Sequence, residues 1–404
     1  LLNISDQPTY FYPSVGVSGV ISEMVSLPKF ISFWKMRASF AEVGGPINYT
    51  GLTPGTVTDP MKGGVINPIS VYPFPNFKAE QTKSYELGTN LRLFNNKINI
   101  DATVYLTDTY NQTFLSSMSP ASGYSGFYVQ AGKVRNKGIE LSLGYNDRFG
   151  KVGYATNLTY TANRNKIMKM VHDYKNPSDG SLFSITELTL QDKGGVYLRE
   201  KDAIGDVYVK GILARGKDGK LIEEEGGYKV DRSQRIKIGS VNPDFSIGWR
   251  HNVTWNNITL DLLFNGRFGG IVTSSTQAFL DDYGVSKDTY KARQNGGVWV
   301  NGTQYDAEKY YTTIGGEQLM AYYAYKATNI RLQEASLSYT LPGKWFGNVI
   351  NRLTVSAIGR NLWMIYNKAP FDPEMTSSTG TYNRGDVFMP PSLRSVGFSV
   401  KIEL

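Results

Sequence analysis

Alternation of apolar and polar residues is the dominant pattern along this chain, and it has a period of two. In the segment 97–107, Ile98 and Ile100 fall on one side, while Asn99 and Asp101 fall on the other. Successive side chains of a β-strand point to opposite faces of its sheet, so this pattern predicts a strand with one apolar and one polar face. A half-buried strand of a soluble sheet shows the same alternation, so its repetition at a suitable length has to decide between the two.

The alternation recurs at lengths that suit strands crossing a membrane. The clearest further segments are 34–40, 84–93, 139–145, 152–160, 245–255, 258–268 and 395–404. We count about eleven such strands, many close to the roughly 9–11 residues that cross a bilayer at a tilt. Two residues break the pattern, because His251 lies on an otherwise apolar face and Leu263 lies on a polar one. The segment 353–360 is also less regular.

The connections between these strands alternate between short and long. The short connections are 25–31, 95–96, 146–151, 256–257 and 342–351. The long connections are 45–79, 115–133, 166–242, 270–328 and 365–391. Strict alternation places every long connection at the same end of the sheet, as in outer-membrane barrels with short periplasmic turns and long extracellular loops. The sequence therefore predicts an all-β, antiparallel transmembrane β-barrel.

Composition agrees with a barrel and argues against other membrane or secreted classes. Hydrophobic residues make up 41% of the 404 residues, and no run of about 18 apolar residues appears, so we expect no transmembrane helix. Alternating strands keep the mean hydropathy of a barrel low. The chain has no Cys, which excludes a disulfide scaffold and thiolate metal sites.

Charge and candidate chemistry favour neither a nucleic-acid-binding protein nor an enzyme. The net charge is +8, but the basic residues are spread among nearly as many acidic ones, so we expect contact with anionic lipopolysaccharide rather than with nucleic acid. Two histidines, His172 and His251, are present without Cys and without a G-x-S-x-G motif. The acidic run 223–225 lacks the spacing of a calcium loop, so we expect no metal and no cofactor.

Six motifs, in order along the chain, resemble those of one protein family. They are KSYELGTNLRLFNNKINIDATVY at 83–105, GKVRNKGIELSL at 132–143, KIGSVNPDFSIGWRHNVTW at 237–255, RLQEASLSYTLP at 331–342, GRNLWMIYNKAPFDPE at 359–374, and the closing PSLRSVGFSVKIEL. In these motifs the chain is similar to the SusC/RagA-like TonB-dependent outer-membrane transporters of Bacteroidetes. One departure is the terminal Leu404, where the family usually has Phe.

The resemblance implies a barrel of about 22 strands around an N-terminal plug, of which about eleven strands are half. We therefore expect residues 1–404 to form the C-terminal part of the barrel. The start at Leu1, without Met or a signal peptide, leads us to expect that the plug and the first strands belong to a preceding part of the protein.

The resemblance also implies TonB-dependent import of a large nutrient, such as an oligosaccharide or an oligopeptide, across the outer membrane. Its expected partners are a SusD-like surface lipoprotein, TonB acting through the N-terminal part, the rest of the barrel with its plug, and outer-membrane lipid. Such proteins often form a dimer of transporter–lipoprotein pairs. A passive pore, or a structural or assembly component of an outer-membrane complex, stays open as an alternative because a fold does not fix a function.

Candidate substrate-contacting residues lie on the predicted inner face and in the loop 270–328. Charged side chains on the inner face would meet a wet lumen or the plug, and loop tyrosines would stack on sugars or peptide side chains. The alternatives are ion pairing within the barrel and packing of the loops on each other. The candidates are Glu86, Asp101, Arg250, Asp261, Arg267, Tyr305 and Tyr323.

Overall fold

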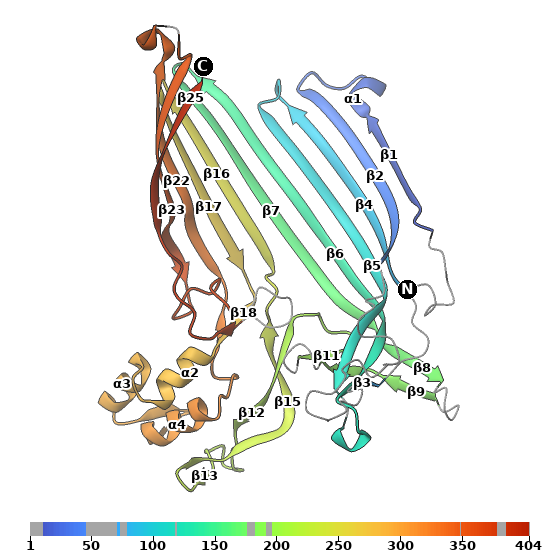
Figure 1. Ribbon diagram of the computed structural model, residues 1–404, viewed down its shortest axis with the longest axis vertical. Coiled ribbons are helices and arrows are strands. Elements are labelled where there is room, and N and C mark those ends of the chain that lie inside the picture. The colour runs from blue at the N-terminus through green and yellow to red at the C-terminus, as the bar shows by residue number, and fades with distance from the viewer. Residues whose placement is uncertain are drawn as a thin grey trace, which may run out of the picture.

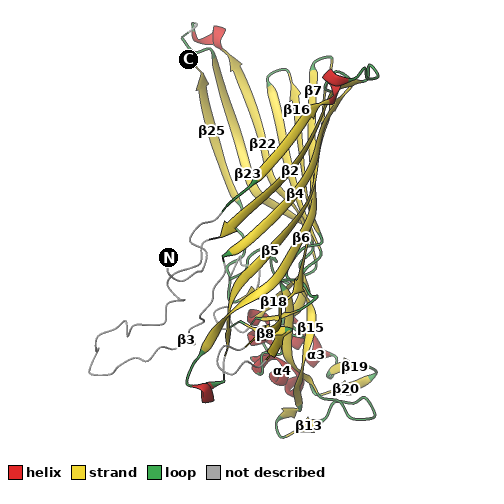
Figure 2. Ribbon diagram, turned by 90° about the vertical axis from the view of Figure 1, so that its right-hand side faces the viewer, coloured by secondary structure: helices red, strands yellow, loops and turns green. Residues whose placement is uncertain are grey.

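A single curved sheet forms the body of the molecule (Figures 1 and 2). The computed structural model describes residues 11–45, 71–72, 79–117, 119–175, 182–190, 196–347, 349–377 and 385–403. Eleven strands follow one another through this sheet, each antiparallel to the next, which confirms the predicted number. In order they are β1 (Ser14–Val20), β2 (Ile31–Gly45), β4 (Glu80–Leu93), β5 (Ile98–Ser117), β6 (Gly126–Phe149), β7 (Val152–Lys169), β16 (Phe245–Trp255), β17 (Ile258–Phe268), β22 (Asn329–Pro342), β23 (Arg352–Asn367) and β25 (Ser395–Glu403).

One face of this sheet is an exposed apolar surface. Leu337 is 55% exposed, and Phe398, on the final strand, is 84% exposed. The buried apolar clusters found among the described residues lie at the loop end of the strands and in the loops, not between two sheet layers. Apolar rows that stay exposed on a one-layer sheet suit a surface that faces hydrocarbon, as the alternation predicts.

His251 and Leu263, which break the alternation, lie on the faces that the period of two assigns to their positions. His251 lies on the apolar face, where its Nδ1 is 2.9 Å from the hydroxyl of Tyr154 and its ring centroid is 4.3 Å from that of Trp249. Leu263 lies on the polar face, between Arg250 and Glu334 in the register. Neither exception shifts the strand register, because the side-chain period of a strand is two along its whole length.

The short connections gather at one end of the sheet and the long ones at the other (Figure 1). In the turn between β4 and β5, Phe94, Asn95 and Asn96 have φ values of 53°, 58° and 64°, which is the left-handed region that asparagine tolerates best. Two predicted connections are too long. Strand β6 continues to Phe149 and β7 begins at Val152, so the turn near 146–151 is much shorter than expected. The segment 115–133 is largely strand, because β5 and β6 extend past the barrel as a hairpin.

The described parts of two long connections, 166–242 and 270–328, are folded rather than irregular, which the sequence analysis did not anticipate; most of the connection 45–79 lies outside the described residues. Small sheets occupy 171–240 and are formed by β8 (Val171–Lys175), β9 (Leu182–Ile185), β10 (Glu187–Thr189), β11 (Tyr197–Arg199), β12 (Asp206–Leu213), β13 (Glu223–Glu224), β14 (Gly227–Tyr228) and β15 (Val230–Ser240). The connection 270–328 holds β18 (Ile271–Ser274), α2 (Ser275–Asp282), α3 (Lys287–Gln294), β19 (Val298–Val300), β20 (Thr303–Tyr305), α4 (Ala307–Gly316) and β21 (Ala324–Lys326).

Local signals explain these three loop helices. The side chains of Ser274, Ser286 and Asp306 each accept a hydrogen bond from a backbone N–H in the first turn of α2, α3 and α4. The remaining elements are short: β3 (Val71–Tyr72), β24 (Gly385–Asp386), α1 (Ile21–Met24) and the 3₁₀ turns Pro120–Ser122 and Gly343–Phe346. Within the described residues, each helix is too short or too polar to cross a membrane.

Candidate functional site

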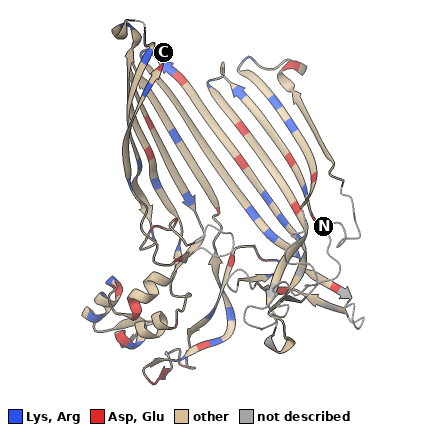
Figure 3. Ribbon diagram, viewed as in Figure 1, with Lys and Arg blue, Asp and Glu red and all other residues tan. Residues whose placement is uncertain are grey.

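The polar face of the sheet carries two clusters of charged side chains. Figure 3 marks the charged positions along the strands. On β2 and β5, Arg37 donates to Asp101 at 2.9 Å and to Thr103 at 2.5 Å, while Asn90 donates to Asp101 at 3.1 Å. Arg37 lies across Gly88, where a Cβ would come within 2.5 Å of the Nε atom of the arginine. A glycine at this position therefore lets the guanidinium lie flat on the inner wall and reach two strands away.

The second cluster lies on β16 and β17, on the other side of the same face. The Nε of Arg250 lies 2.9 Å and 3.0 Å from the two carboxylate oxygens of Asp261, and Asn252 donates to Asp261 at 3.3 Å. In the same register row as Arg250, two strands further on, Glu334 on β22 pairs with Arg360 on β23 at 2.8 Å. The inner face thus offers fixed charges of both signs to whatever fills the lumen.

The connections 203–242 and 270–328 pack together as one folded unit, which we call the loop module. Its core contains Leu213, Leu221, Ile314 and Leu319, which are at most 8% exposed. Side chains of the second connection satisfy backbone N–H groups of the first: Leu213, Leu221 and Tyr228 donate to Tyr322 Oη, Tyr305 Oη and Thr313 Oγ1 at 3.0, 3.0 and 3.1 Å. An ion pair of 2.7 Å between Arg232 and Glu317 joins the same two connections.

Several tyrosines of the loop module are buried or have a raised pKa. Tyr323 is 1% exposed and Tyr305 is 8% exposed, so neither presents a ring face to solvent. Burial raises the pKa of Tyr310 and of Tyr311 to about 12, so both stay neutral at physiological pH. The structure therefore favours loop packing over substrate stacking for Tyr305 and Tyr323.

We expect Thr313→Val to loosen the loop module, because the buried amide of Tyr228 then loses its acceptor. An unsatisfied buried donor costs about 1–3 kcal/mol. Hydrogen exchange at the Tyr228 amide measures the effect and should rise at least about tenfold. The matched control is Thr312→Val on the same helix, whose hydroxyl bonds only to carbonyls within α4, at 2.7 Å for Glu308. Equal exchange in both variants would contradict the assignment.

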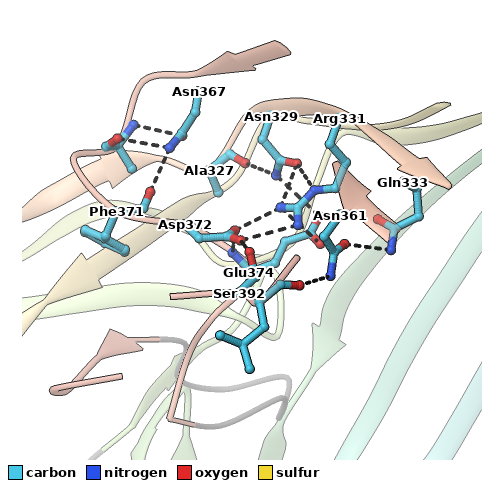
Figure 4. A network of polar contacts seen from close by, with 12 residues as sticks. Ala327, Asn329, Arg331, Gln333, Asn361, Asn367, Phe371, Asp372, Glu374 and Ser392 are labelled. Carbon is cyan, nitrogen blue, oxygen red and sulfur yellow. Dashed lines mark hydrogen bonds and ion pairs between the residues drawn. The ribbon is translucent and has the colours of Figure 1, made fainter. Parts of the chain in front are cut away.

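A buried ion pair fastens the last long connection to the inner wall (Figure 4). Arg331 on β22 donates to the carboxylate of Asp372 at 2.8 and 3.3 Å, and the two side chains are 6% and 8% exposed. Ser392 also donates to Asp372, and Arg331 lies 3.4 Å from Glu374. Arg331 opens the motif RLQEASLSYTLP and Asp372 belongs to the motif that ends in DPE, so the fold joins one residue of each motif across 41 positions of the chain.

The electrostatics of this pair differ from those of a surface salt bridge. Burial alone would raise the pKa of Asp372, but hydrogen bonds from Arg331, from Ser392 and from the backbone of Glu374 outweigh burial and lower it. Asp372 is therefore ionised at neutral pH, and its buried carboxylate accepts these hydrogen bonds at the loop end of the barrel. Removing one partner from such a buried pair is costly.

A cavity of about 630 Å³ opens where β7 separates from β16 at the loop end. Its lining includes Asn163, Arg164, Asp244, Lys326 and Phe245. Amide, carboxylate and ammonium groups beside aromatic rings suit a hydrogen-bonding ligand that also has apolar faces, such as a sugar or a peptide. The sequence analysis missed these residues. Asp244 lies in the motif KIGSVNPDFS, which was the available signal.

The predicted site residues are therefore dispersed over the molecule. Asp101, Arg250 and Asp261 belong to the two inner-wall clusters, and Glu86 lies exposed on the same face. Arg267 donates to the carbonyl of Val241 at 2.7 Å, close to the cavity. Substrate contact by these residues stays a prediction. Among the described residues, no group of three His, Cys, Asp or Glu side chains is placed to hold a metal ion.

Comparison with known proteins shows what this arrangement is similar to. The family model for a TonB dependent receptor-like β-barrel matches residues 3–199. Residues 3–199 thus resemble a TonB-dependent receptor-like β-barrel, and the chain has the fold of such a barrel. It is accordingly a protein of the outer membrane, with its long loops outside the cell and its short turns in the periplasm.

Relatives and solved structures of this family agree on the fold. TonB-dependent receptor P3 of Formosa agariphila is 24% identical, with 92% of this chain and 39% of the relative covered. TonB-dependent receptor P39 of the same organism is 22% identical, with coverages of 94% and 40%. The structure of the RagAB peptide transporter matches with a TM-score of 0.72 at 18% identity, over 97% of this chain and 43% of that one. The chain thus spans about two fifths of the length of these curated relatives.

Proposed function

We propose that this chain is the C-terminal part of a transporter that imports a large nutrient by a TonB-dependent mechanism. The observation that carries the proposal is a one-layer sheet of eleven strands with an apolar outer face and a charged inner face. Eleven strands are half of a barrel with about 22 strands, the size at which the lumen holds a plug. The remaining strands and the plug belong, on this proposal, to the part that precedes residue 1.

The loop end of the barrel supports the proposal that the cargo is large. The loop module and the anchored last connection surround the mouth with polar and aromatic side chains, and the cavity of about 630 Å³ opens beside them. The solved relatives that match include a peptide transporter and a peptide importer. Oligopeptides are therefore the first cargo to test, with oligosaccharides as the second.

A surface lipoprotein of the SusD type is the proposed partner at the loop end. Large apolar side chains are exposed there: Tyr283 is 77% exposed, Val285 is 67% exposed and Phe388 is 64% exposed. Phe388 stacks on Phe279 with ring centroids 5.4 Å apart. Contiguous apolar surface on a folded loop is typical of a protein contact. We propose no bond-breaking chemistry and no cofactor for the barrel.

A genetic experiment with the full-length gene separates active import from the alternatives. Strains that lack the barrel gene, the TonB gene or an adjacent lipoprotein gene are grown on oligopeptides or on oligosaccharides as the limiting nutrient. We expect the first two strains to lose growth on the same cargo to the same extent, about tenfold or more, and the third strain to lose part of it. A passive pore predicts that growth survives loss of TonB. A structural component predicts no cargo-specific defect in any strain.

A further inference from the structure

Basic residues gather at the loop-side ends of β4 to β7 (Figure 3), and the register places six of them on the outer face. The last wholly apolar row there joins Leu87, Val104, Ile139 and Ala162 in register. Two residues further toward the loops, on the same face, the rows contain basic side chains. We call this set the outer basic patch; it consists of Lys83, Lys133, Arg135, Lys137, Arg164 and Lys166.

The acidic residues of this region neutralise only part of the outer basic patch. Asp108 bonds both Arg135, at 2.7 and 2.8 Å, and Lys133, at 2.8 Å. The other two carboxylates are those of Glu42, 3.4 Å from Lys83, and Asp244, 2.7 Å from Arg164. Six cations thus meet three carboxylates, which leaves an excess of three positive charges.

Lys137 and Lys166 are the free members of the outer basic patch. Both side chains are exposed, and within the described part of the chain neither has an ion pair. Lys137 is opposite Arg164 in the register, and Lys166 is opposite Arg135, so the two lysines lie diagonally across β6 and β7. Neighbouring like charges repel one another, so an anion that lies between them is favoured.

The position of the patch along the strands indicates what the anion belongs to. Apolar rows that face hydrocarbon end directly beside it, so the patch lies at the level of the lipid headgroups of the outer leaflet. Tyr85, 50% exposed and 5.1 Å from the ring of Phe40, lies in the row of Lys137 and marks the same boundary. Basic side chains at a membrane surface attract anionic headgroups.

The patch is confined to one sector of the wall. At the loop-side ends of β16 and β17, the outward positions hold Phe245 and Phe268, whose rings stack with centroids 4.6 Å apart. At the corresponding ends of β22 and β23, Ile330 and Tyr366 are paired in register. An aromatic girdle without cations is the ordinary edge of a barrel. On β4 to β7, basic side chains take the place of this girdle. Anchoring by aromatic residues therefore does not explain this sector.

We propose that the outer basic patch binds the phosphate groups of a phosphorylated glycolipid in the outer leaflet, of the lipid A type. Lys137 and Lys166 contact one phosphate directly, while Arg164 and Arg135 contribute from their salt bridges. The acyl chains of the lipid lie against the apolar row that contains Val104 and Ile139. The site goes beyond import, because it concerns how the barrel is seated in its membrane; Arg164 also lines the cavity at the loop end, whereas Lys137 and Lys166 do not.

Binding of lipid A to the full-length protein in detergent tests this assignment. Native mass spectrometry follows titration with diphosphoryl lipid A, with the same lipid after removal of its phosphates, and with inorganic phosphate as competitor. We expect the double variant Lys137→Gln, Lys166→Gln to bind diphosphoryl lipid A about 20- to 30-fold more weakly, since each cation near an anionic lipid contributes about a factor of five. The matched control is Lys217→Gln, Lys220→Gln, two exposed lysines of the loop 214–221, and it should bind within twofold of the unchanged protein.

Each outcome decides the proposal. Weaker binding in the double variant, together with weak binding of the dephosphorylated lipid, supports it. Equal binding of the dephosphorylated lipid, or an unaffected double variant that still shows the heat-modifiable mobility of a folded barrel, overturns it. Competition by inorganic phosphate at the concentration of the lipid would assign the patch to free phosphate instead. Nutrient uptake is measured separately in cells, so failure of either result leaves the other standing.

Discussion

Replacing Arg331 by Met is expected to release the last long connection from the inner wall and to cost about 3–5 kcal/mol of local stability. The substitution leaves the carboxylate of Asp372 buried at 8% exposure without its cation. Hydrogen exchange in the segments 368–377 and 385–394 of the full-length protein measures the effect, and protection should fall by at least about 100-fold. These segments hold Asp372 and Ser392, which bond each other.

The control for this variant is Arg352→Met. Arg352 lies on the neighbouring strand β23, at the end of the barrel opposite to Arg331. Arg352 pairs with Glu403 at 3.7 Å, and its side chain is 59% exposed. An exposed pair contributes about 0–1 kcal/mol, so exchange at either end of the barrel should change little. If Arg331→Met left the two segments as protected as before, other contacts would have to hold the connection, and the buried pair would not be the anchor.

The same pair predicts a dependence on pH with a definite sign. The pKa of Asp372 is lowered in the folded protein, so the unfolded connection binds a proton at higher pH than the folded one. The stabilisation is therefore fully present above the ordinary value of about 3.9 and is lost as pH falls through the lowered pKa. We therefore expect the protection factors of the connection to fall as the pH is lowered. The Arg331→Met variant should not show this fall.

The second large effect concerns the outer face in mid-strand. We expect Leu141→Arg to reduce insertion of the barrel by about 2–4 kcal/mol, because the arginine then meets hydrocarbon. Leu141 is aligned with Ala102 and Tyr160, in a row that continues the apolar surface. The adjacent Ser142→Arg should cost little, because Ser142 lies on the polar face and donates to Asn157 at 2.9 Å.

The fraction of protein that inserts into lipid vesicles, read as the heat-modifiable band on a gel, compares these two variants directly. Neighbouring positions on one strand share backbone propensity, strand register and distance from the turns. Any difference between them therefore reports only which face meets lipid. Equal losses in both variants would show that the face assignment is wrong.

The sequence determined the features that depend on local periodicity. A period of two divides each strand into two faces, and the alternation of short and long connections sorts the loops to one end, so strand number and orientation could be predicted without coordinates. The exceptions His251 and Leu263 were also placed on the correct faces. Charged inner-face residues such as Asp101 and Arg250 were identified for the same reason.

Only the tertiary structure decided what the connections do. Nothing in the local pattern indicates that Tyr305 and Tyr323 are buried in a core shared by two connections, since that core forms from segments about 85 residues apart, as for Tyr228 and Thr313. The pairing of Arg331 with Asp372 and the excess of cations on the outer face of β4 to β7 depend likewise on which strands become neighbours. Periodicity is a property of neighbours along the chain, whereas burial and charge balance are set by neighbours in space.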